Sequence, residues 1–181
     1  MNNDEPMYAA PAIDGMFSGW INMKKLLICI LLIFGVFLCP WPGWAQSLPV
    51  MDLQAYNQFL EKNKGKVIVV DFWATWCGPC RKKLPELQKC RDVFPKEDLT
   101  LIGISLDFNP ETLATYLQDN PLNYPVYLAE ENLAEQLEVQ AIPLLFVYDV
   151  AGQLQIVEEG LTPHDTLCQN IDNLTADPAD P

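Results

Sequence analysis

Residues 70–80 read VDFWATWCGPC and end in two cysteines, Cys77 and Cys80, that are separated by two residues. The apolar run 67–73 predicts a buried strand, and we expect a helix to begin at the first cysteine. A sulfur at the start of a helix lies at the positive end of the helix dipole, which favours thiolate over thiol. A thiolate with a second thiol three residues away can carry out dithiol–disulfide exchange. The sequence therefore predicts a redox-active pair at Cys77 and Cys80.

A cysteine pair at this spacing has two other interpretations. Such a pair is often half of a zinc site, but zinc needs about four ligands. The chain after residue 45 offers no second CxxC and one histidine, His164, so we expect no metal site. A purely structural disulfide is the other interpretation, and the surrounding sequence is too specific to favour it.

The stretch 70–80 resembles the active-site segment of thioredoxin almost position by position. Pro85 falls where that family kinks its active-site helix, and Ile142–Pro143 matches the family's cis-proline loop. The resemblance extends over about residues 51–174. The spacing is similar to that of the TlpA/ResA-like extracytoplasmic branch, whose members carry an added helix–strand element, and residues 110–139 have the length and pattern for it.

This resemblance implies an α/β fold, a thioredoxin-like three-layer α/β/α sandwich with a central mixed β-sheet. The residue pattern agrees, because strands alternate with helices before a hairpin and a final helix. Strands are expected at residues 67–73, 99–106, 124–128, 144–148 and 154–158. Helices are expected after an N-cap at Asp52, at residues 77–93, 112–118 and 132–137, and from Pro163 to Leu174 after an N-cap at Thr162.

The resemblance implies different roles for the two cysteines and an aspartate. Cys77 is expected to be exposed and to act as the nucleophile, whereas Cys80 is expected to be buried and to resolve the mixed disulfide. Asp71 matches the family's buried aspartate and is the candidate acceptor for the proton of Cys80; its apolar neighbours should raise its pKa toward neutrality. The family often has a lysine near this acid in the next strand. Gly103 stands there, so we expect Asp71 to lack that charge partner.

Substrate contacts are expected at Trp76, Gly78, Pro79, Ile142 and Pro143. A cis peptide at Ile142–Pro143 would bring the Ile142 backbone next to the cysteines, where it can pair with an extended substrate chain. Trp76 offers an apolar rim. The Gly78–Pro79 pair resembles that of reducing thioredoxins, which favours reduction of substrates over their oxidation.

Targeting signals are expected before the domain. Residues 23–45 have the pattern of a signal peptide, with two lysines, an apolar run of 13 residues and a small-x-small site that ends at Ala45. That run is short for a membrane span, although a retained membrane anchor stays open. We interpret residues 1–22 as a non-native or disordered extension, residues 46–175 as the thioredoxin-like domain, and residues 176–181 as a flexible tail.

Charge is divided unevenly along the domain. Residues 46–96 carry nine Lys/Arg and five Asp/Glu, whereas residues 97–181 carry 16 Asp/Glu and no Lys or Arg. The negative excess disfavours nucleic acid and anionic membranes as partners. Solubility alone explains it, and steering toward a partner protein stays open.

Two further cysteines, Cys90 and Cys168, fall in the active-site helix and the final helix. The resemblance places both helices on one face of the sheet, so a structural disulfide could join them. We expect instead two buried free thiols, because free cysteine packs as a small hydrophobe.

These observations predict an exported thiol–disulfide oxidoreductase, in particular a disulfide reductase of the bacterial periplasm. The resemblance implies no cofactor beyond the redox-active Cys77–Cys80 disulfide, and a membrane thiol carrier of the DsbD/CcdA type as electron donor. It implies protein disulfide substrates such as apocytochrome c, with general envelope thiol homeostasis left open, and we expect a monomer. Two alternatives remain: a disulfide oxidase or isomerase on the same scaffold, and a copper-binding chaperone that uses the two cysteines as soft ligands.

Overall fold

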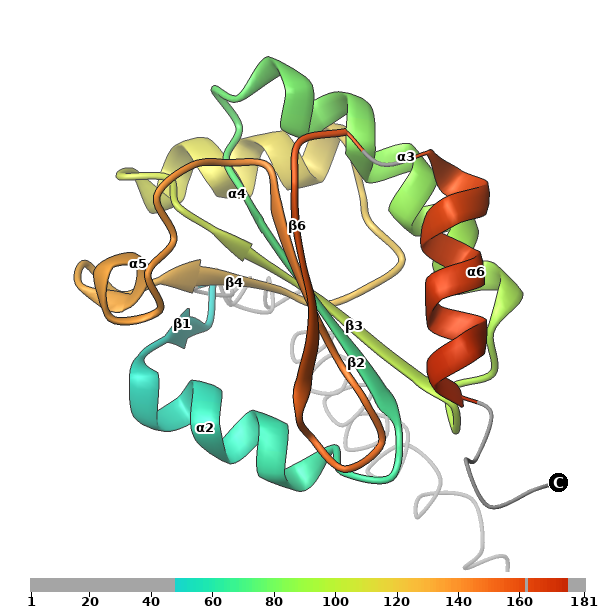
Figure 1. Ribbon diagram of the computed structural model, residues 1–181. Helices are drawn as coiled ribbons and strands as arrows, with labels where there is room; N and C mark the ends of the chain where they lie inside the picture. The colour runs from blue at the N-terminus through green and yellow to red at the C-terminus, as the bar shows by residue number, and fades with distance from the viewer. Residues whose placement is uncertain (1–47, 162, 176–181) are drawn as a thin grey trace, which may run out of the picture. The chain divides into compact units, whose positions relative to one another are not determined.

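The computed structural model describes residues 48–161 and 163–175, which fold around a six-stranded sheet (Figure 1). The strands are β1 (Val50–Met51), β2 (Val67–Trp73), β3 (Leu99–Ser105), β4 (Val126–Ala129), β5 (Leu144–Tyr148) and β6 (Leu154–Glu159). Their order across the sheet is β1-β4-β3-β2-β5-β6. Strands β1, β4, β3 and β2 are parallel to one another. Strand β5 pairs with β2 in antiparallel register, and β6 pairs with β5 in the same way. The sheet is therefore mixed, as predicted.

Helices cover both faces of this sheet. They are α2 (Leu53–Lys62), α3 (Gly78–Val93), α4 (Pro110–Asp119), α5 (Leu133–Gln136) and α6 (His164–Thr175). On one face, Leu87 of α3 and Ile171 of α6 share a buried cluster with Val69 of β2. On the other, Tyr56 of α2 packs in a cluster with Val70 of β2, which α5 also joins. The predicted three-layer α/β/α sandwich is confirmed.

Strand β2 carries the site and lies at the centre of the sheet. It pairs with β3 on one side and β5 on the other, and all seven of its residues are buried. A nearly continuous apolar run suits a strand that is covered on both faces. Asp71 is the one charged residue in this strand, so the fold places a carboxyl group in the middle of the core.

Polar side chains define two of the helix starts. Asp52 accepts a hydrogen bond from the Ala55 N–H at 2.6 Å, which confirms the predicted N-cap of α2. Asn109 caps α4 by accepting from the Glu111 N–H at 2.8 Å, and Pro110 follows it in the first turn. Helix α4 therefore begins two residues before the predicted start.

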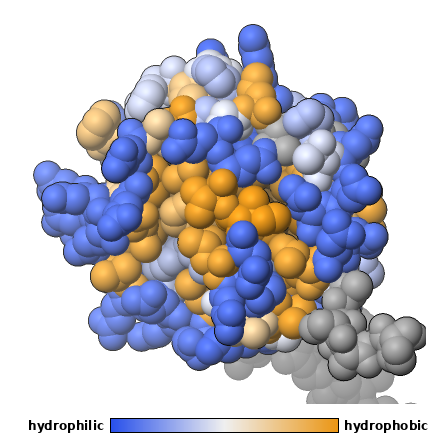
Figure 2. All heavy atoms as spheres, in the orientation of Figure 1, coloured by the Kyte–Doolittle hydropathy of each residue, from blue (hydrophilic) through white to orange (hydrophobic). Residues whose placement is uncertain are grey.

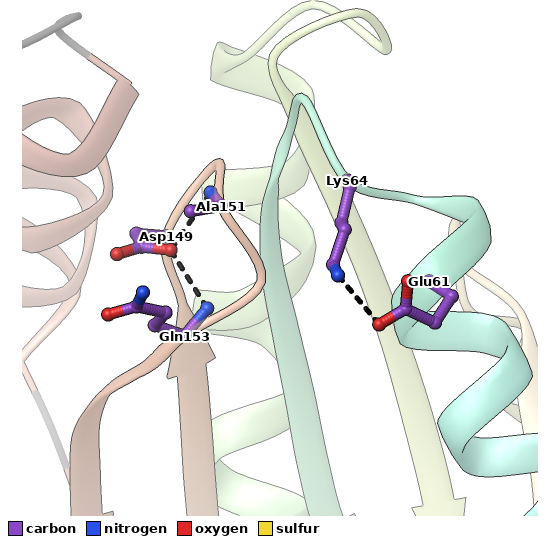
Figure 3. A network of polar contacts seen from close by, with 5 residues as sticks. All are labelled: Glu61, Lys64, Asp149, Ala151 and Gln153. Carbon is purple, nitrogen blue, oxygen red and sulfur yellow. Dashed lines mark hydrogen bonds and ion pairs between the residues drawn. The ribbon is translucent and has the colours of Figure 1, made fainter.

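The β5–β6 turn closes the sheet at the end of β2 that is away from Cys77 (Figure 3). The carboxylate of Asp149 accepts from the N–H groups of Ala151 and Gln153, both at 2.9 Å. Next to this turn, Lys64 forms an ion pair with Glu61 at the end of α2. The side chain of Lys64 lies so close to Gly152 that an added Cβ would come within 3.0 Å of it. Turn and helix end thus pack as a unit remote from the cysteines.

The edge strand β6 lies on a face with an apolar centre and a hydrophilic surround (Figure 2). Leu154 and Val157 of this strand are among the exposed large hydrophobic residues. Glu158 and Glu159 add charge at the end of the same strand. Charge on an edge strand disfavours pairing with a second chain.

Some predicted features differ from the structure or lie outside the residues that it describes. Strand β1, which pairs with β4, was not predicted because it is only two residues long. The extension 1–22, the signal peptide 23–45 and the tail 176–181 fall outside the described residues, as does the predicted N-cap Thr162. Within the described ranges, no helix has the length and apolar character to cross a membrane.

The expectation of two free thiols at Cys90 and Cys168 is wrong. The structure joins them by a disulfide whose Cα atoms are 5.7 Å apart. Helices α3 and α6 pack side by side on one face, and Cys90 is fully buried between them and the sheet. This close packing, which residue pattern alone does not show, brings the two sulfurs together.

Candidate active site

Cys77 stands at the junction of β2 and α3, where it is the N-cap residue of the helix. Its Sγ is bonded to that of Cys80 and accepts a hydrogen bond from the Cys80 N–H at 3.1 Å. The first turn of the helix thus directs its N–H groups and its positive end at this sulfur. That geometry stabilises negative charge on the sulfur once the disulfide is reduced.

The expectation that Cys77 is well exposed is wrong for this oxidised structure. Cys77 is 5% exposed and Cys80 is 1% exposed. Both belong to a buried cluster with Trp73, and Ile142 packs against that cluster. The order of exposure agrees with the prediction, but Cys77 is nearly as buried as Cys80.

The residues between the cysteines shape the start of α3. Gly78 is the first residue of the helix and Pro79 the second. Proline is favoured here, because N–H groups in the first turn have no partner within the helix. An added Cβ at Gly78 would meet nothing within 4 Å, so this position presents open backbone beside the disulfide. Pro85 lies inside α3, as predicted.

A hydrogen-bonded network holds the loop that leads to Cys77. Asp107 accepts from the Thr75 N–H at 3.0 Å and from the Thr75 hydroxyl at 2.6 Å. The Ser105 hydroxyl also donates to Asp107, at 2.6 Å. The loop is therefore tied to the end of β3 two residues before the nucleophile position. The sequence analysis missed this role of Asp107, although a carboxylate directly after a buried strand is a signal that could have found it.

The Ile142–Pro143 peptide is cis, as predicted. The carbonyl oxygen of Ile142 lies 3.9 Å from the Cys77 sulfur. The structure thus brings the predicted loop and the predicted cysteine together, although they are far apart in the sequence.

Asp71 is buried in β2, and neither of its carboxyl oxygens has a hydrogen-bond partner among the described residues. Burial raises the pKa of Asp71 to about 7, and the ammonium group of Lys83 opposes this increase. Asp71 points to the same face of the sheet as Trp73, which packs in one cluster with Cys80. The carboxyl group can therefore gain and lose a proton near neutral pH on the Cys80 side of the sheet.

Asp71 lacks the charge partner that the family often has in the next strand, as expected, but it does not lack a cation. Gly103 does lie opposite Asp71 in β3, as the sequence comparison implied. A cation comes instead from the active-site helix, where Lys83 is 2% exposed. Lys83 follows two other basic residues, Arg81 and Lys82, and such a run is typical of a solvated helix face, although of the three only Lys83 is buried here. Its position three residues after buried Cys80, on the same face of the helix, was the available signal.

Apolar side chains line two pockets at Trp76, the residue before Cys77. Trp76 is 61% exposed and lines a pocket of about 310 Å³ with Leu106 and Ile142. Trp76 and Leu106 also line an adjoining pocket of about 560 Å³, at which Phe108 is 94% exposed. These two exposed aromatic side chains, of which Trp76 directly precedes Cys77, form a surface on which an apolar segment of another chain can dock. Phe108 was not singled out from the sequence.

Of the eight predicted site residues, the structure gathers six around the disulfide: Trp76, Cys77, Gly78, Pro79, Cys80 and Ile142, with Pro143 next in the chain. Asp71 lies below them in the core. Within residues 48–161 and 163–175 there is no group of three His, Cys, Asp or Glu side chains that could hold a metal ion.

Comparison with known protein families and relatives agrees with this geometry. The sequence profile of the AhpC/TSA family matches residues 45–157. Sporulation thiol-disulfide oxidoreductase A of Bacillus subtilis is 26% identical over 151 residues, which cover 76% of this chain and 90% of that protein. Thiol-disulfide oxidoreductase ResA of Geobacillus kaustophilus is 21% identical over 123 residues, which cover 67% of this chain and 71% of that protein.

Solved structures with the same fold include two from bacteria. The crystal structure of StoA from Bacillus subtilis has a TM-score of 0.54 and 26% sequence identity, covering 59% of this chain and 83% of that one. A DsbE-type thiol:disulfide interchange protein from Chlorobium tepidum has a TM-score of 0.61 at 24% identity, covering 65% of this chain and 85% of that one. The second likeness shows the fold alone.

Proposed function

Because the chain belongs to the AhpC/TSA family of thioredoxin-like proteins, we propose that it is a thiol–disulfide oxidoreductase that reduces disulfides in other proteins. The observation that carries this proposal is the Cys77–Cys80 disulfide at the start of α3. A disulfide that closes within one helical turn, at the positive end of the helix and beside a docking surface, is suited to exchange with an external disulfide.

The proposed reaction begins with the reduced enzyme. The Cys77 thiolate attacks one sulfur of the substrate disulfide, the substrate S–S bond breaks, and a mixed disulfide forms as one substrate thiolate leaves. Cys80 then loses its proton to Asp71 and attacks the Cys77 sulfur, which releases the second substrate thiolate. The substrate gains two electrons, and the enzyme is left as the Cys77–Cys80 disulfide.

Binding of the substrate chain is proposed to use the surface beside Cys77. The Ile142 backbone lies within reach of the sulfur, and an extended chain can pair with it as an added strand. Apolar residues that flank the substrate cysteine would pack on Trp76, while Gly78 and Pro79 leave the approach to the sulfur open. Pro143 holds the other end of this loop, since its carbonyl accepts from the Gly160 N–H at 2.8 Å.

The direction, compartment and partners belong to the same proposal. The Gly78–Pro79 pair supports reduction over oxidation, and the signal pattern at residues 23–45 supports export to the periplasm. A membrane thiol carrier of the DsbD/CcdA type would return electrons to the oxidised enzyme. Apocytochrome c before haem attachment is a candidate client.

The experiment that tests the direction is the reduction potential of the purified domain from Gln46 onward. The protein is equilibrated against defined thiol buffers, with Cys77→Ser as the blank that reports the Cys90–Cys168 disulfide alone. A value near about −270 mV, the region of thioredoxin, supports a reductase. A value near about −120 mV, the region of the oxidant DsbA, would overturn that direction and assign the protein to disulfide formation.

A further inference from the structure

A buried lysine on the active-site helix has no role in the exchange chemistry described so far. Lys83 lies one helical turn after Cys80, on the same face of α3, and is 2% exposed. Its ammonium donates a hydrogen bond to the Gly160 carbonyl at 3.1 Å. Burying a lysine is costly unless its charge is compensated, so such a position calls for an explanation.

The sheet under Lys83 presents two carboxyl groups in one row. Asp71 pairs with Leu145, and Leu145 pairs with Glu158. Paired residues on adjacent strands point to the same face, and strands lie about 4.8 Å apart, so the backbones at Asp71 and Glu158 stand about 10 Å apart. Both interact with the Lys83 ammonium. Lys83 is therefore the cation shared by a buried acid in β2 and a half-buried acid in β6.

The opposite side of Asp71 has no room for a cation. Its neighbour there is Gly103 in β3, and an added Cβ at this position would lie 3.0 Å from the Trp73 indole nitrogen and 3.4 Å from the Tyr124 ring. Any longer side chain would have to displace those two aromatic rings. The charge that faces Asp71 must therefore come from the helix above the sheet.

We propose that Lys83 is a positioning residue that keeps Asp71 ionised often enough near neutral pH to take the proton from Cys80. This inference rests on the role proposed above for Asp71. Lys83 does not touch the substrate or the sulfurs; it acts through Asp71, and the Gly160 carbonyl, which accepts from its ammonium, holds it in place.

The groups that face Asp71 determine the sign of the effect. Burial raises the pKa of Asp71 to about 7, and Lys83 of α3 lowers it. Tyr124, which precedes β4, also faces Asp71; burial raises the pKa of this phenol well above its usual value, so it stays neutral. Burial lowers the pKa of Lys83, while Asp71 and Glu158 raise it. Removing the ammonium should therefore shift ionisation of Asp71 to higher pH.

The test adds a chromogenic aromatic disulfide to the reduced enzyme and follows the reactions of Cys77 and Cys80 separately. Attack by Cys77 releases a first aromatic thiol, and attack by Cys80 on the mixed disulfide releases a second. In the wild type we expect the second rate to rise with pH around a midpoint near 7, the pKa of Asp71. In Lys83→Met we expect this midpoint to move up by about one pH unit, with a several-fold slower second phase at pH 7 and an unchanged first phase.

Matched variants separate the possible outcomes. Lys82→Met removes the same charge from the exposed face of the same helix and should leave the midpoint in place. Lys83→Arg keeps the charge, so its second phase should have the wild-type pH midpoint. Lys83→Gln replaces Lys83→Met if the latter does not fold. The role of Lys83 would be overturned if Lys83→Met and Lys83→Gln both had the same midpoint as Lys82→Met.

Asp71→Asn distinguishes failure of this inference from failure of the proposed function. Loss of the pH midpoint in Asp71→Asn, with the same profile after Lys83→Met is added to it, is expected if Lys83 acts through Asp71. If the second phase of Asp71→Asn has the same pH profile as that of the wild type, Asp71 is not the proton acceptor. If Asp71→Asn loses the midpoint but Lys83→Met does not shift it, the role of Lys83 is overturned. The proposed exchange reaction would not be affected by that result.

Discussion

The sulfur of Cys77 lies 3.9 Å from the carbonyl oxygen of Ile142, although 65 residues separate the two in the sequence. One residue starts the active-site helix α3, and the other precedes β5, the strand that pairs with β2 in antiparallel register. A chain that docks along Ile142 would therefore have its own disulfide beside the Cys77 sulfur. This relationship motivates a test in which the exchange reaction is stopped halfway.

Replacement of Cys80 by serine should trap substrates on the enzyme. Without a resolving thiol, the mixed disulfide between Cys77 and a client persists, so we expect covalent adducts that disappear when a reductant is added. The measurement is non-reducing electrophoresis of the affinity-purified variant after expression of the full-length chain. Cys77→Ser/Cys80→Ser is the control and should give no adducts. Equal adducts from both variants would assign the trapping to another cysteine.

Asp71 should make folding stability depend on pH. Its pKa is about 7 in the folded protein and near 3.8 in the unfolded chain, so the folded state binds the proton more tightly. The stabilisation from the protonated form is complete below about pH 4 and is lost as the pH rises through about 7. Asp71→Asn cannot ionise, so its unfolding free energy relative to the wild type should increase from pH 4 to pH 8 by up to roughly 4 kcal/mol.

Urea unfolding of both proteins at pH 4, 6 and 8 measures this difference. Glu159→Asn, at an exposed position of β6, is the matched control for loss of one carboxylate. A difference between Asp71→Asn and wild type that stays constant over this range would show that Asp71 does not titrate near neutrality.

The sequence was enough to predict the strand and helix that carry the redox pair. Seven successive residues of β2 are apolar apart from Asp71, and such a run leaves little choice but a buried central strand. The N-cap at Asp52 and the positions of Cys77 and Pro79 are also local signals, because they depend on neighbours in the chain.

What the sequence could not predict depends on how the layers pack. Lys83 reads as one of three consecutive charged residues, and only the sheet beneath α3 shows that it is buried above Asp71. The same is true of Cys90 and Cys168, whose pairing depends on the distance between two helices. Local pattern indicates which face a residue prefers, but distances between elements come from the packed core.

The second disulfide should stabilise the domain without contributing to exchange. It closes a loop of 78 residues between α3 and α6, and cross-links of that kind contribute about 2–4 kcal/mol. We expect the Cys90→Ala/Cys168→Ala variant to lose about that much unfolding free energy in urea. Its first-phase reaction with the aromatic disulfide should stay unchanged, since Cys77 and Cys80 remain. A large loss of exchange activity in folded protein would assign the second pair a redox role.

Trp76 should matter for protein substrates and hardly at all for stability. Its side chain is 61% exposed, so Trp76→Ala should change the unfolding free energy by less than about 0.5 kcal/mol. The apolar surface beside Cys77 would shrink, and we expect the KM for a disulfide-bonded protein to rise several-fold while the rate with a small aromatic disulfide changes little. Trp76→Phe should recover part of the affinity. Val157→Ala removes exposed apolar surface from β6, at the far side of the sheet order from β4, and should leave both rates unchanged. Equal losses on protein and small-molecule substrates in Trp76→Ala would mean that the indole acts on the cysteine chemistry rather than on docking.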